Sequence, residues 1–373
     1  MSKFTDRVVL ILNILGAAGM LMAYLAPSVN PARMVLPALF GLAYPYLLML
    51  HLAFLCYWLI RLKKEILISI LVILLGWNHL NNLIPLNLRP SEIPVNSSQD
   101  KYLKALSYNV RGFNIYQWSR EPEAKKEIFE FLESQEPQLV CFQEYFTSEK
   151  SGQTHAQISR QLDYLPFSAV YYTADPANRN GFGIATFSKH PILKKSRIPF
   201  NSSFNAAMYT DILFRSDTIR IFNIHLQSIR FQEDNYAFID TARFKYSNEQ
   251  ISEIRAIGSR LKTAFTLRAE QAKVIASYIK DSPHPVVVMG DFNCEWDDET
   301  SPVRHLADSL GLHAFRPEAE GFDTFGNGGR RLDWILVSAE LEFTSFRVLP
   351  EVLSDHAAVM AEIEYIEPPE DND

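Results

Sequence analysis

Cysteine is scarce in the 373-residue sequence, and its three cysteines form no pattern. Cys56 lies in an apolar run, Cys141 in a strand-like run, and Cys294 beside a motif of acidic and amide residues. Because no paired spacing is present, neither a disulfide framework nor a zinc cluster is indicated. The sequence also lacks internal repeats and low-complexity tracts. The compartment and the chemistry therefore have to be inferred from charge, apolar runs and motifs.

Most of the chain carries more acidic than basic residues. Residues 1–90 hold seven Lys/Arg and two acidic residues, a net of +5. The remaining 29 basic and 41 acidic residues give 91–373 a net charge of −12. An acidic surface repels phosphate backbones, so its charge disfavours tight, sequence-independent binding of duplex DNA. Cleavage of nucleic acid is not excluded, because the local field at a site can oppose the net charge.

Three apolar stretches open the chain, at 8–26, 35–60 and 66–84. Each is near the ~20 residues that a helix needs to cross a bilayer. The second stretch contains Pro37, Pro45 and His51, which such helices tolerate. The third weakens at 78–82, where four of five residues are Asn or His. We predict three transmembrane helices, although the first stretch alone resembles a signal peptide and the third a buried helix.

The basic residues around these stretches predict an orientation. With three crossings, the N-terminus and the 61–65 loop share one side of the membrane. That side carries Lys3, Arg7, Arg61, Lys63 and Lys64, whereas the other carries Arg33 and Arg89. Because the excess of positive charge marks the cytoplasmic side, we expect the rest of the chain in the periplasm of a bacterium, anchored in its inner membrane. The prediction reverses if the third stretch does not cross.

The remainder of the chain predicts one domain rich in strands. We expect a membrane anchor over 1–88, a Pro-punctuated linker over 89–101, a catalytic domain over 102–366 and a disordered acidic tail over 367–373. Short β-rich runs alternate with helical segments, and a long helical insertion over 232–264 precedes an amphipathic helix over 267–280. This pattern predicts an α+β fold, a four-layer α/β/β/α sandwich of two packed β-sheets.

Polar side chains recur where the predicted strands begin or end, which is where proteins usually place chemistry. They are Asn109, Glu144, His225, Asp291, Asn293, Asp333, Asp355 and His356. Each alone is ordinary, since Asp-x-Asn is common in turns and a His between apolar residues is usually a core residue. Taken together, they form a set of carboxylates, amides and imidazoles in a single domain.

The order of the motifs resembles the endonuclease/exonuclease/phosphatase family. The series is Ser-Tyr-Asn-Val, Gln-Glu, Asn-Ile-His-Leu, Gly-Asp-Phe-Asn, Arg-Leu-Asp-Trp-Ile and Ser-Asp-His, and it covers about 102–364. The segment 181–192 is similar to the family's usual segment between the Glu and His motifs. The 232–264 insertion and the apolar N-terminus depart from the smaller members. Both departures leave the identity of the substrate open, and neither affects the predicted chemistry.

The resemblance implies a role for each residue. Glu144, Asn109 and Asp355 would hold a divalent metal, and their oxygen atoms favour Mg²⁺, with Mn²⁺ as a possibility. Asp291 would position and deprotonate the attacking water, and Asn293 would donate to an oxygen on phosphorus. His225 and His356 would contact the phosphate, with Asp333 orienting His356. Arg111 either reaches the phosphate or is an exposed loop cation.

The function predicted is therefore a membrane-anchored, divalent-metal-dependent hydrolase of a phosphodiester or phosphomonoester. The alternative is a catalytically silent, membrane-tethered module that binds a phosphate ligand. Nucleic acid and phospholipid or lipid-linked phosphate both stay open as substrates, and membrane attachment favours the lipids. The sequence indicates no protein partner.

Overall fold

The computed structural model describes residues 3–26, 29, 34–76, 101–115, 124–150, 153–173, 181–200, 205–229, 248–296, 301–315, 323–325, 330–349, 351 and 353–366. The chain forms two compact units. The first contains Met1–Leu88, Ile229–Ala269 and Trp296–Arg304, and the second contains Arg89–Ser228, Glu270–Glu295 and His305–Asp373. The linker and the tail predicted from the sequence lie almost entirely outside the described residues, and the predicted domain boundaries stay predictions.

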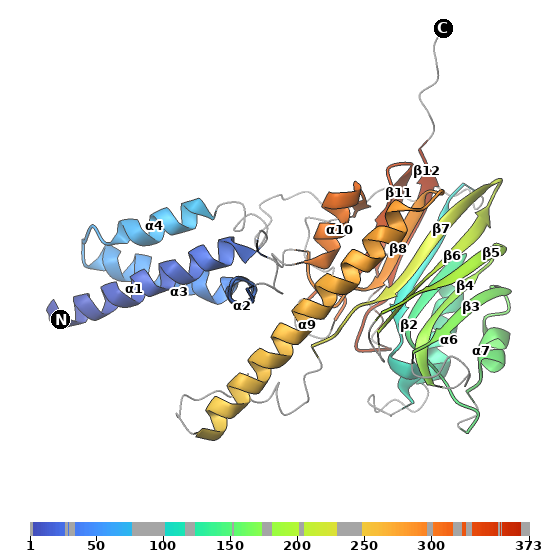
Figure 1. Ribbon diagram of the computed structural model, residues 1–373, viewed down its shortest axis with the longest axis horizontal. Coiled ribbons are helices and arrows are strands. Elements are labelled where there is room, and N and C mark those ends of the chain that lie inside the picture. The colour runs from blue at the N-terminus through green and yellow to red at the C-terminus, as the bar shows by residue number, and fades with distance from the viewer. Residues whose placement is uncertain are drawn as a thin grey trace, which may run out of the picture. The chain divides into compact units, whose positions relative to one another are not determined.

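The first unit is helical (Figure 1). Its helices are α1 (Lys3–Tyr24), α2 (Leu36–Leu42), α3 (Tyr44–Ile60), α4 (Ile66–Leu75) and the first part of α9 (Asn248–Lys280). Met20, Ala23, Leu48 and Val72 form the apolar centre of the α1, α3 and α4 bundle.

Polar contacts also join the helices of this bundle. At one end, Asp6 of α1 accepts hydrogen bonds from Tyr57 (2.7 Å) and from Arg61 (2.9 Å). In the interior, the hydroxyl of Ser69 lies 3.0 Å from Asn13 Oδ1 and 2.9 Å from His51 Nδ1. These hydrogen bonds join α1, α3 and α4. An apolar side chain at any of these positions would remove one of them.

Among the described residues, one helix is long and apolar enough to cross a membrane, at Phe4–Tyr24. Helices α2 and α3 reach the required length only as a pair that bends by 66°. Helix α4 is apolar but has only 10 residues, and 77–84 of the third predicted span lie outside the described residues. The structure therefore supports one spanning helix, or two with the bent pair, and not the full set of three predicted from the sequence.

The second unit contains two six-stranded sheets. The first has the order β11-β12-β1-β2-β4-β3 and the second has the order β5-β6-β7-β8-β10-β9. The strands of the first sheet are β1 (Leu103–Asn109), β2 (Leu139–Thr147), β3 (Phe167–Tyr172), β4 (Gly181–Ser188), β11 (Leu341–Val348) and β12 (Val359–Tyr365). Those of the second are β5 (Ile192–Ile198), β6 (Ala206–Phe214), β7 (Asp217–His225), β8 (Val286–Asp291), β9 (His313–Ala314) and β10 (Asp333–Val337). Both sheets are mixed, since β1 pairs with β2 and β7 with β8 in parallel.

The two sheets share an apolar interior, built from alternate residues of their strands. Ala105 and Cys141 of the first sheet pack with Ile221, Met289 and Ile335 of the second. Further along the same strands the interior becomes polar, and Gln143 Nε2 donates to Asn223 Oδ1 across the sheets (2.9 Å). The side chain of Asn223 in turn donates to the carbonyl oxygen of Ala185 (2.9 Å). A buried hydrogen-bonded layer therefore separates the apolar interior from the ends of the strands.

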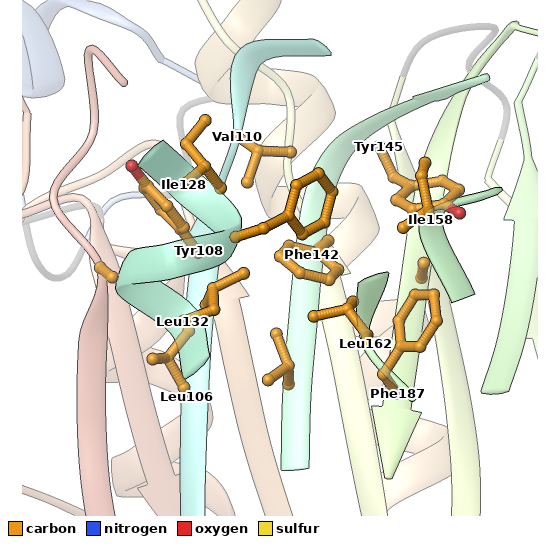
Figure 2. Packing of buried hydrophobic residues seen from close by; sticks show 14 of the residues in the cluster. Leu106, Tyr108, Val110, Ile128, Leu132, Phe142, Tyr145, Ile158, Leu162 and Phe187 are labelled. Atoms are coloured by element: carbon orange, nitrogen blue, oxygen red, sulfur yellow. The ribbon is translucent and has the colours of Figure 1, made fainter. Parts of the chain in front are cut away.

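Helices cover the outer face of each sheet. On the first sheet these are α6 (Ala124–Gln135) and α7 (His155–Gln161). Ile128 and Leu132 of α6 are one helical turn apart and pack against Tyr108 and Phe142 of the sheet, as Figure 2 shows. On the second sheet, the ring of Tyr278 in α9 lies 6.4 Å from that of Tyr209 in β6. A further helix, α10 (Pro302–Leu310), precedes β9. This order of helix, sheet, sheet and helix is the sandwich predicted from the sequence.

Three strands and one helix differ from the sequence prediction. Strands β5 and β11 and the two-residue β9 were not predicted, and all three lie at the edges of their sheets. Strand β5 carries Lys194, Lys195 and Arg197, charges that are typical of an edge strand and obscure the apolar alternation. Helix α9 is continuous from Asn248 to Lys280, so the predicted break between an insertion and a second helix is wrong.

Candidate active site

Three neighbouring strands of the second sheet bring polar residues into one row. Asp291 of β8 is in register with His225 of parallel β7 and with Asp333 of antiparallel β10. Residues in register point to the same face of a sheet, so all three continue the inner face that Met289 and Ile335 occupy deeper in the sandwich. The row thus lies at the end of the interior between the sheets.

A glycine allows the close approach of two of these strands. Gly290, directly before Asp291, has φ +146°, and a Cβ at this position would collide with the carbonyl oxygen of Ile224. Only glycine combines this backbone angle with this contact. As a result, Asp291 Oδ2 lies 3.6 Å from His225 Nε2, with both side chains more than nine-tenths buried.

The first sheet contributes Asn109 to the same point. Its Nδ2 donates to Asp291 Oδ2 at 3.0 Å, a direct hydrogen bond between the two sheets. The backbone N–H of Arg111 donates to Asn109 Oδ1 (3.1 Å), which fixes the orientation of the amide. The hydroxyl of Ser354 donates to the carbonyl oxygen of Asn109 (2.8 Å). Asn109 is 1% exposed, so the amide is held entirely by protein groups at these positions.

His356 reaches Asp291 from the other side. Its Nε2 lies 3.7 Å from Asp291 Oδ2, and its Nδ1 lies 2.8 Å from Asp333 Oδ2. The ring also packs edge-on against Phe325, with ring centroids 4.9 Å apart. Thr324 Oγ1 accepts the backbone N–H of Asp333 (3.0 Å) and so positions the start of β10. The ring of His356 is therefore fixed by a carboxylate on one edge and an aromatic ring beside it.

The electrostatics of this pair favour a charged imidazole. Burial disfavours the protonated ring, but the carboxylates of Asp333 and Asp291 outweigh this and raise the pKa of His356 to about 10. At neutral pH the ring is therefore an imidazolium whose Nε2–H points towards Asp291. Such a donor stabilises negative charge near Asp291.

Asn293 lies just beyond the end of β8, so the alternation of strand side chains does not orient it. Its backbone has φ +52°, and its N–H donates to Asp291 Oδ1 (2.8 Å). Its side-chain Nδ2 donates to the carbonyl oxygen of Leu226 (3.0 Å), which also accepts from Asn205. Asn293 therefore holds the second oxygen of Asp291 and joins the ends of β7 and β8.

Glu144 lies inside β2 rather than at its end, because the strand continues to Thr147. The pairing of β2 with β4 shifts register between Phe142 and Tyr145, and Glu144 has φ +49°. A bulge of this kind redirects a side chain that regular pleating would place elsewhere, at a cost of order 1–3 kcal/mol for the backbone angle. Gln143, the residue before it, is in register with Asn109 of β1.

Asp355 is paired with Arg111. Its Oδ2 lies 3.0 Å from the guanidinium of Arg111, and both side chains are partly exposed. Arg111 begins a turn (η2, Arg111–Asn114) in which every residue has positive φ. Phe113 of this turn stacks on Phe129, with ring centroids 5.4 Å apart, and so anchors the strained backbone. Arg111 is therefore a partly exposed cation of this turn that is paired with Asp355.

One group of acidic and imidazole side chains is spaced closely enough to hold a metal ion. Among the described His, Cys, Asp and Glu residues, only Asp291, Asp333 and His356 place three possible ligand atoms within 4.8 Å of one another. In this group the hydrogen bond between Asp333 Oδ2 and His356 Nδ1 already uses one possible ligand atom of each residue. The predicted ligands Glu144 and Asp355 do not belong to this group.

Several residues of the site were not identified from the sequence. Thr324, Asn205 and Ser354 position the backbone and side chains described above. Asn223 lies two residues before His225 on the same face of β7, and its alternation with His225 is a signal that was present in the sequence. Thr324 and Asn205 lie outside any apolar run, so only their contacts identify them.

Two family models match separate parts of the chain. A family model described as the endonuclease/exonuclease/phosphatase family matches residues 106–356, about two thirds of the chain. A second model, for a domain of unknown function, matches residues 6–83. No curated protein matches the chain in a sequence search.

Solved structures share the fold at low sequence identity. An endonuclease/exonuclease/phosphatase family protein from Bacteroides thetaiotaomicron has a TM-score of 0.52 and 15% identity, over 72% of this chain and 100% of that one. The catalytic domain of human Nocturnin, with a bound sulfate anion, has a TM-score of 0.51 and 16% identity, over 75% of this chain and 100% of that one. At this identity the structures establish the fold alone.

Proposed function

Because the chain belongs to the endonuclease/exonuclease/phosphatase family, whose members are phosphoric ester hydrolases, we propose that it is a membrane-anchored, divalent-metal-dependent phosphoesterase. The substrate is a phosphodiester or a phosphomonoester. The observation that carries the proposal is the environment of Asp291 Oδ2. It lies 3.0 Å from Asn109 Nδ2, 3.6 Å from His225 Nε2 and 3.7 Å from His356 Nε2.

This environment suits the activation of water beside a phosphate. Asp291 accepts the proton of the attacking water, and Asn109 and Asn293 hold its two oxygens in place. His225 and His356 donate to phosphoryl oxygens, with Asp333 holding the ring of His356 charged and oriented. Both imidazoles lie beyond hydrogen-bonding distance of Asp291, so their Nε2 atoms are suited to donate to the substrate instead. Asn293 would donate to a phosphoryl oxygen only after leaving the carbonyl oxygen of Leu226.

A divalent metal fits the oxygen donors at the same end of the sandwich. Glu144, on its bulge, Asp355 and the amide oxygen of Asn109 are hard ligands of the type that Mg²⁺ and Mn²⁺ prefer. The partial exposure of Asp355 and its salt bridge to Arg111 suit a carboxylate that exchanges one cation for another. When bound, the metal supplies positive charge to the phosphoryl oxygens.

Attachment to the membrane is supported by α1 and by the bent pair α2 and α3. If the third apolar stretch also crosses, the five-to-two excess of basic residues on the side of the N-terminus supports a periplasmic catalytic domain.

The test is hydrolysis of bis(p-nitrophenyl) phosphate by the full chain in detergent, with and without a chelator. We expect turnover with Mg²⁺ or Mn²⁺, its loss in the chelator and its return with added metal. Asp291→Asn should abolish turnover under all three conditions. A chain that binds phosphate but shows no turnover with either metal would instead be the silent binding module. The full chain is used because Ile229–Ala269 interrupts the catalytic domain and packs in the first unit.

A further inference from the structure

Glu144 belongs to a β-bulge with one extra residue. On β2, Phe142 and Tyr145 are three residues apart, but their partners on β4, Ala185 and Gly183, are only two apart. Two residues of β2 therefore oppose a single residue of β4, which is the arrangement that defines a bulge. Glu144 is one of the two, and its φ of +49° shows where the backbone departs from the extended strand.

The bulge decides which face of the first sheet Tyr145 occupies. Its ring belongs with that of Phe142 to the apolar cluster under α6 and α7, with centroids 6.1 Å apart (Figure 2). The side chain of Gln143 points the other way, into the interior, where Nε2 donates to Asn223 Oδ1 (2.9 Å). In a regular strand Gln143 and Tyr145 would share a face, because side chains alternate. Their opposite positions therefore require the extra residue Glu144.

The hydroxyl of Tyr145 is held by His155. Tyr145 is fully buried, and its hydroxyl oxygen lies 2.7 Å from His155 Nδ1. The other ring nitrogen, Nε2, lies 3.1 Å from Ser168 Oγ of β3. Burial lowers the pKa of His155, so at pH 7 the ring is neutral and offers one donor and one acceptor for these two contacts. The start of α7 and β3 therefore fix the direction of the Tyr145 side chain.

The same rings support a second segment of unusual backbone. Phe113 has φ +55°, and its centroid lies 5.7 Å from the centroids of both Phe142 and Tyr145. It belongs to the η2 turn that begins with Arg111, the partner of Asp355. Backbone angles of this kind persist only where surrounding contacts fix them. One aromatic cluster therefore holds both the bulge and the turn.

We propose that Tyr145 and His155 are positioning residues for the metal site. Their hydrogen bond keeps Tyr145 on the outer face of the first sheet, and this position maintains the bulge that presents Glu144 to the metal. The inference rests on the proposed function, in which Glu144 is a ligand. A ligand on a bulge loses its position when the contacts that fix the backbone are removed. The expected consequence is weaker metal binding by a protein that is still folded.

The experiment measures binding of Mn²⁺ to the full chain in detergent, without substrate and well below the unfolding temperature. Free Mn²⁺ is followed by its electron paramagnetic resonance signal, and the site is identified as the binding that Glu144→Ala removes. Tyr145→Phe removes only the hydroxyl and should raise the Kd of this site by about 10-fold. The matched control is Tyr164→Phe, because the buried Tyr164 hydroxyl beside the same cluster has no hydrogen-bond partner among the described residues. The control should leave the Kd unchanged.

Two substitutions of His155 separate its two contacts. In Asn the polar atoms are attached to Cγ, as Nδ1 is in His, so His155→Asn keeps the hydrogen bond to Tyr145. In Gln they lie one bond further from the backbone, nearer the position of Nε2, so His155→Gln keeps only the contact with Ser168. We expect the wild-type Kd in His155→Asn and the higher Kd of Tyr145→Phe in His155→Gln.

A wild-type Kd for Mn²⁺ in folded Tyr145→Phe or in folded His155→Gln would overturn the inference. If only the melting temperature fell in these variants, the contact would serve stability alone. Unchanged Mn²⁺ binding in Glu144→Ala, or no metal-dependent hydrolysis of bis(p-nitrophenyl) phosphate by the wild type, would instead contradict the proposed function itself.

Discussion

The Nδ1 atom of His356 lies 2.8 Å from Oδ2 of Asp333, and both side chains are buried. The carboxylate at this distance helps to raise the pKa of the ring to about 10, against the opposing effect of burial. The imidazolium therefore adds stability that is complete below about pH 6.5 and is lost as the pH rises through about 10. In the imidazolium both nitrogens carry a hydrogen, so Nδ1–H donates to Asp333 and Nε2–H is available to the substrate.

Asp333→Asn should move the alkaline limit of activity to lower pH. Without the carboxylate, the pKa of His356 falls towards its ordinary value of about 6.5, so the charged donor disappears earlier on the alkaline side. We expect the alkaline limb of log kcat/KM to shift by at least about one pH unit. A pH–rate profile of both proteins measures the shift, and an unchanged alkaline limb would separate Asp333 from the charge on His356.

The two residues should also act as a unit in a double-mutant cycle. His356→Ala removes the donor that Asp333 orients, so adding Asp333→Asn should cost little further activity. The kcat/KM values of the wild type, the two single variants and the double variant give the coupling. Fully additive losses would show that Asp333 serves the start of β10 and that His356 needs no support.

Loss of either of two carboxylates should abolish turnover and preserve the fold. Asp291→Asn and Glu144→Ala should each lower kcat by at least about 100-fold, the effect of removing one preorganised charged group. The melting temperature should stay equal or rise, because buried acids at active sites are often held at the expense of stability. Asp281→Asn, in an exposed acid of the same unit, is the control and should change neither quantity. Wild-type turnover in either variant would contradict the assigned roles.

Two glycine substitutions should have opposite effects. Gly290→Ala places a Cβ against the carbonyl oxygen of Ile224 at φ +146°, so it should destabilise the protein by about 1–3 kcal/mol or more. It should also separate Asp291 from His225 and lower activity. Gly258→Ala, in α9 with open space around the new Cβ, should stabilise the protein by about 0.5–1 kcal/mol. Thermal unfolding in one detergent compares the two, and a tolerated Gly290→Ala would contradict the close approach of β7 and β8.

The orientation can be tested by reporters fused after Asp373. If the chain crosses the bilayer three times, five basic residues at the N-terminus and in the 61–65 loop, against two on the other side, predict a catalytic domain outside the cytoplasm. Alkaline phosphatase in this position should be active, and green fluorescent protein exported by the general secretion route should be dark. The reverse pattern would mean that the third apolar stretch does not cross the bilayer.

Local sequence was sufficient for the central strands and for the side chains that they present. Strand β8, for example, forms over the apolar run Val286–Met289, which is buried on both faces. The order of the motifs around Asn109, Asp291 and His356 was also sufficient to predict the family, and the family model confirms it. Charged edge strands such as β5 escaped prediction, because an edge strand is stabilised by its one neighbour rather than by its own apolar pattern.

Contacts between residues distant in the chain were decided only by the tertiary structure. The hydrogen bond from Asn109 to Asp291 joins two sheets, and its existence depends on strand registers that no local pattern encodes. The bulge that turns Glu144, the salt bridge of Arg111 with Asp355, and the membership of Ile229–Ala269 in the helical unit are of the same kind. Residue type and alternation determined which side chains could meet, and packing across the sandwich decided which of them do.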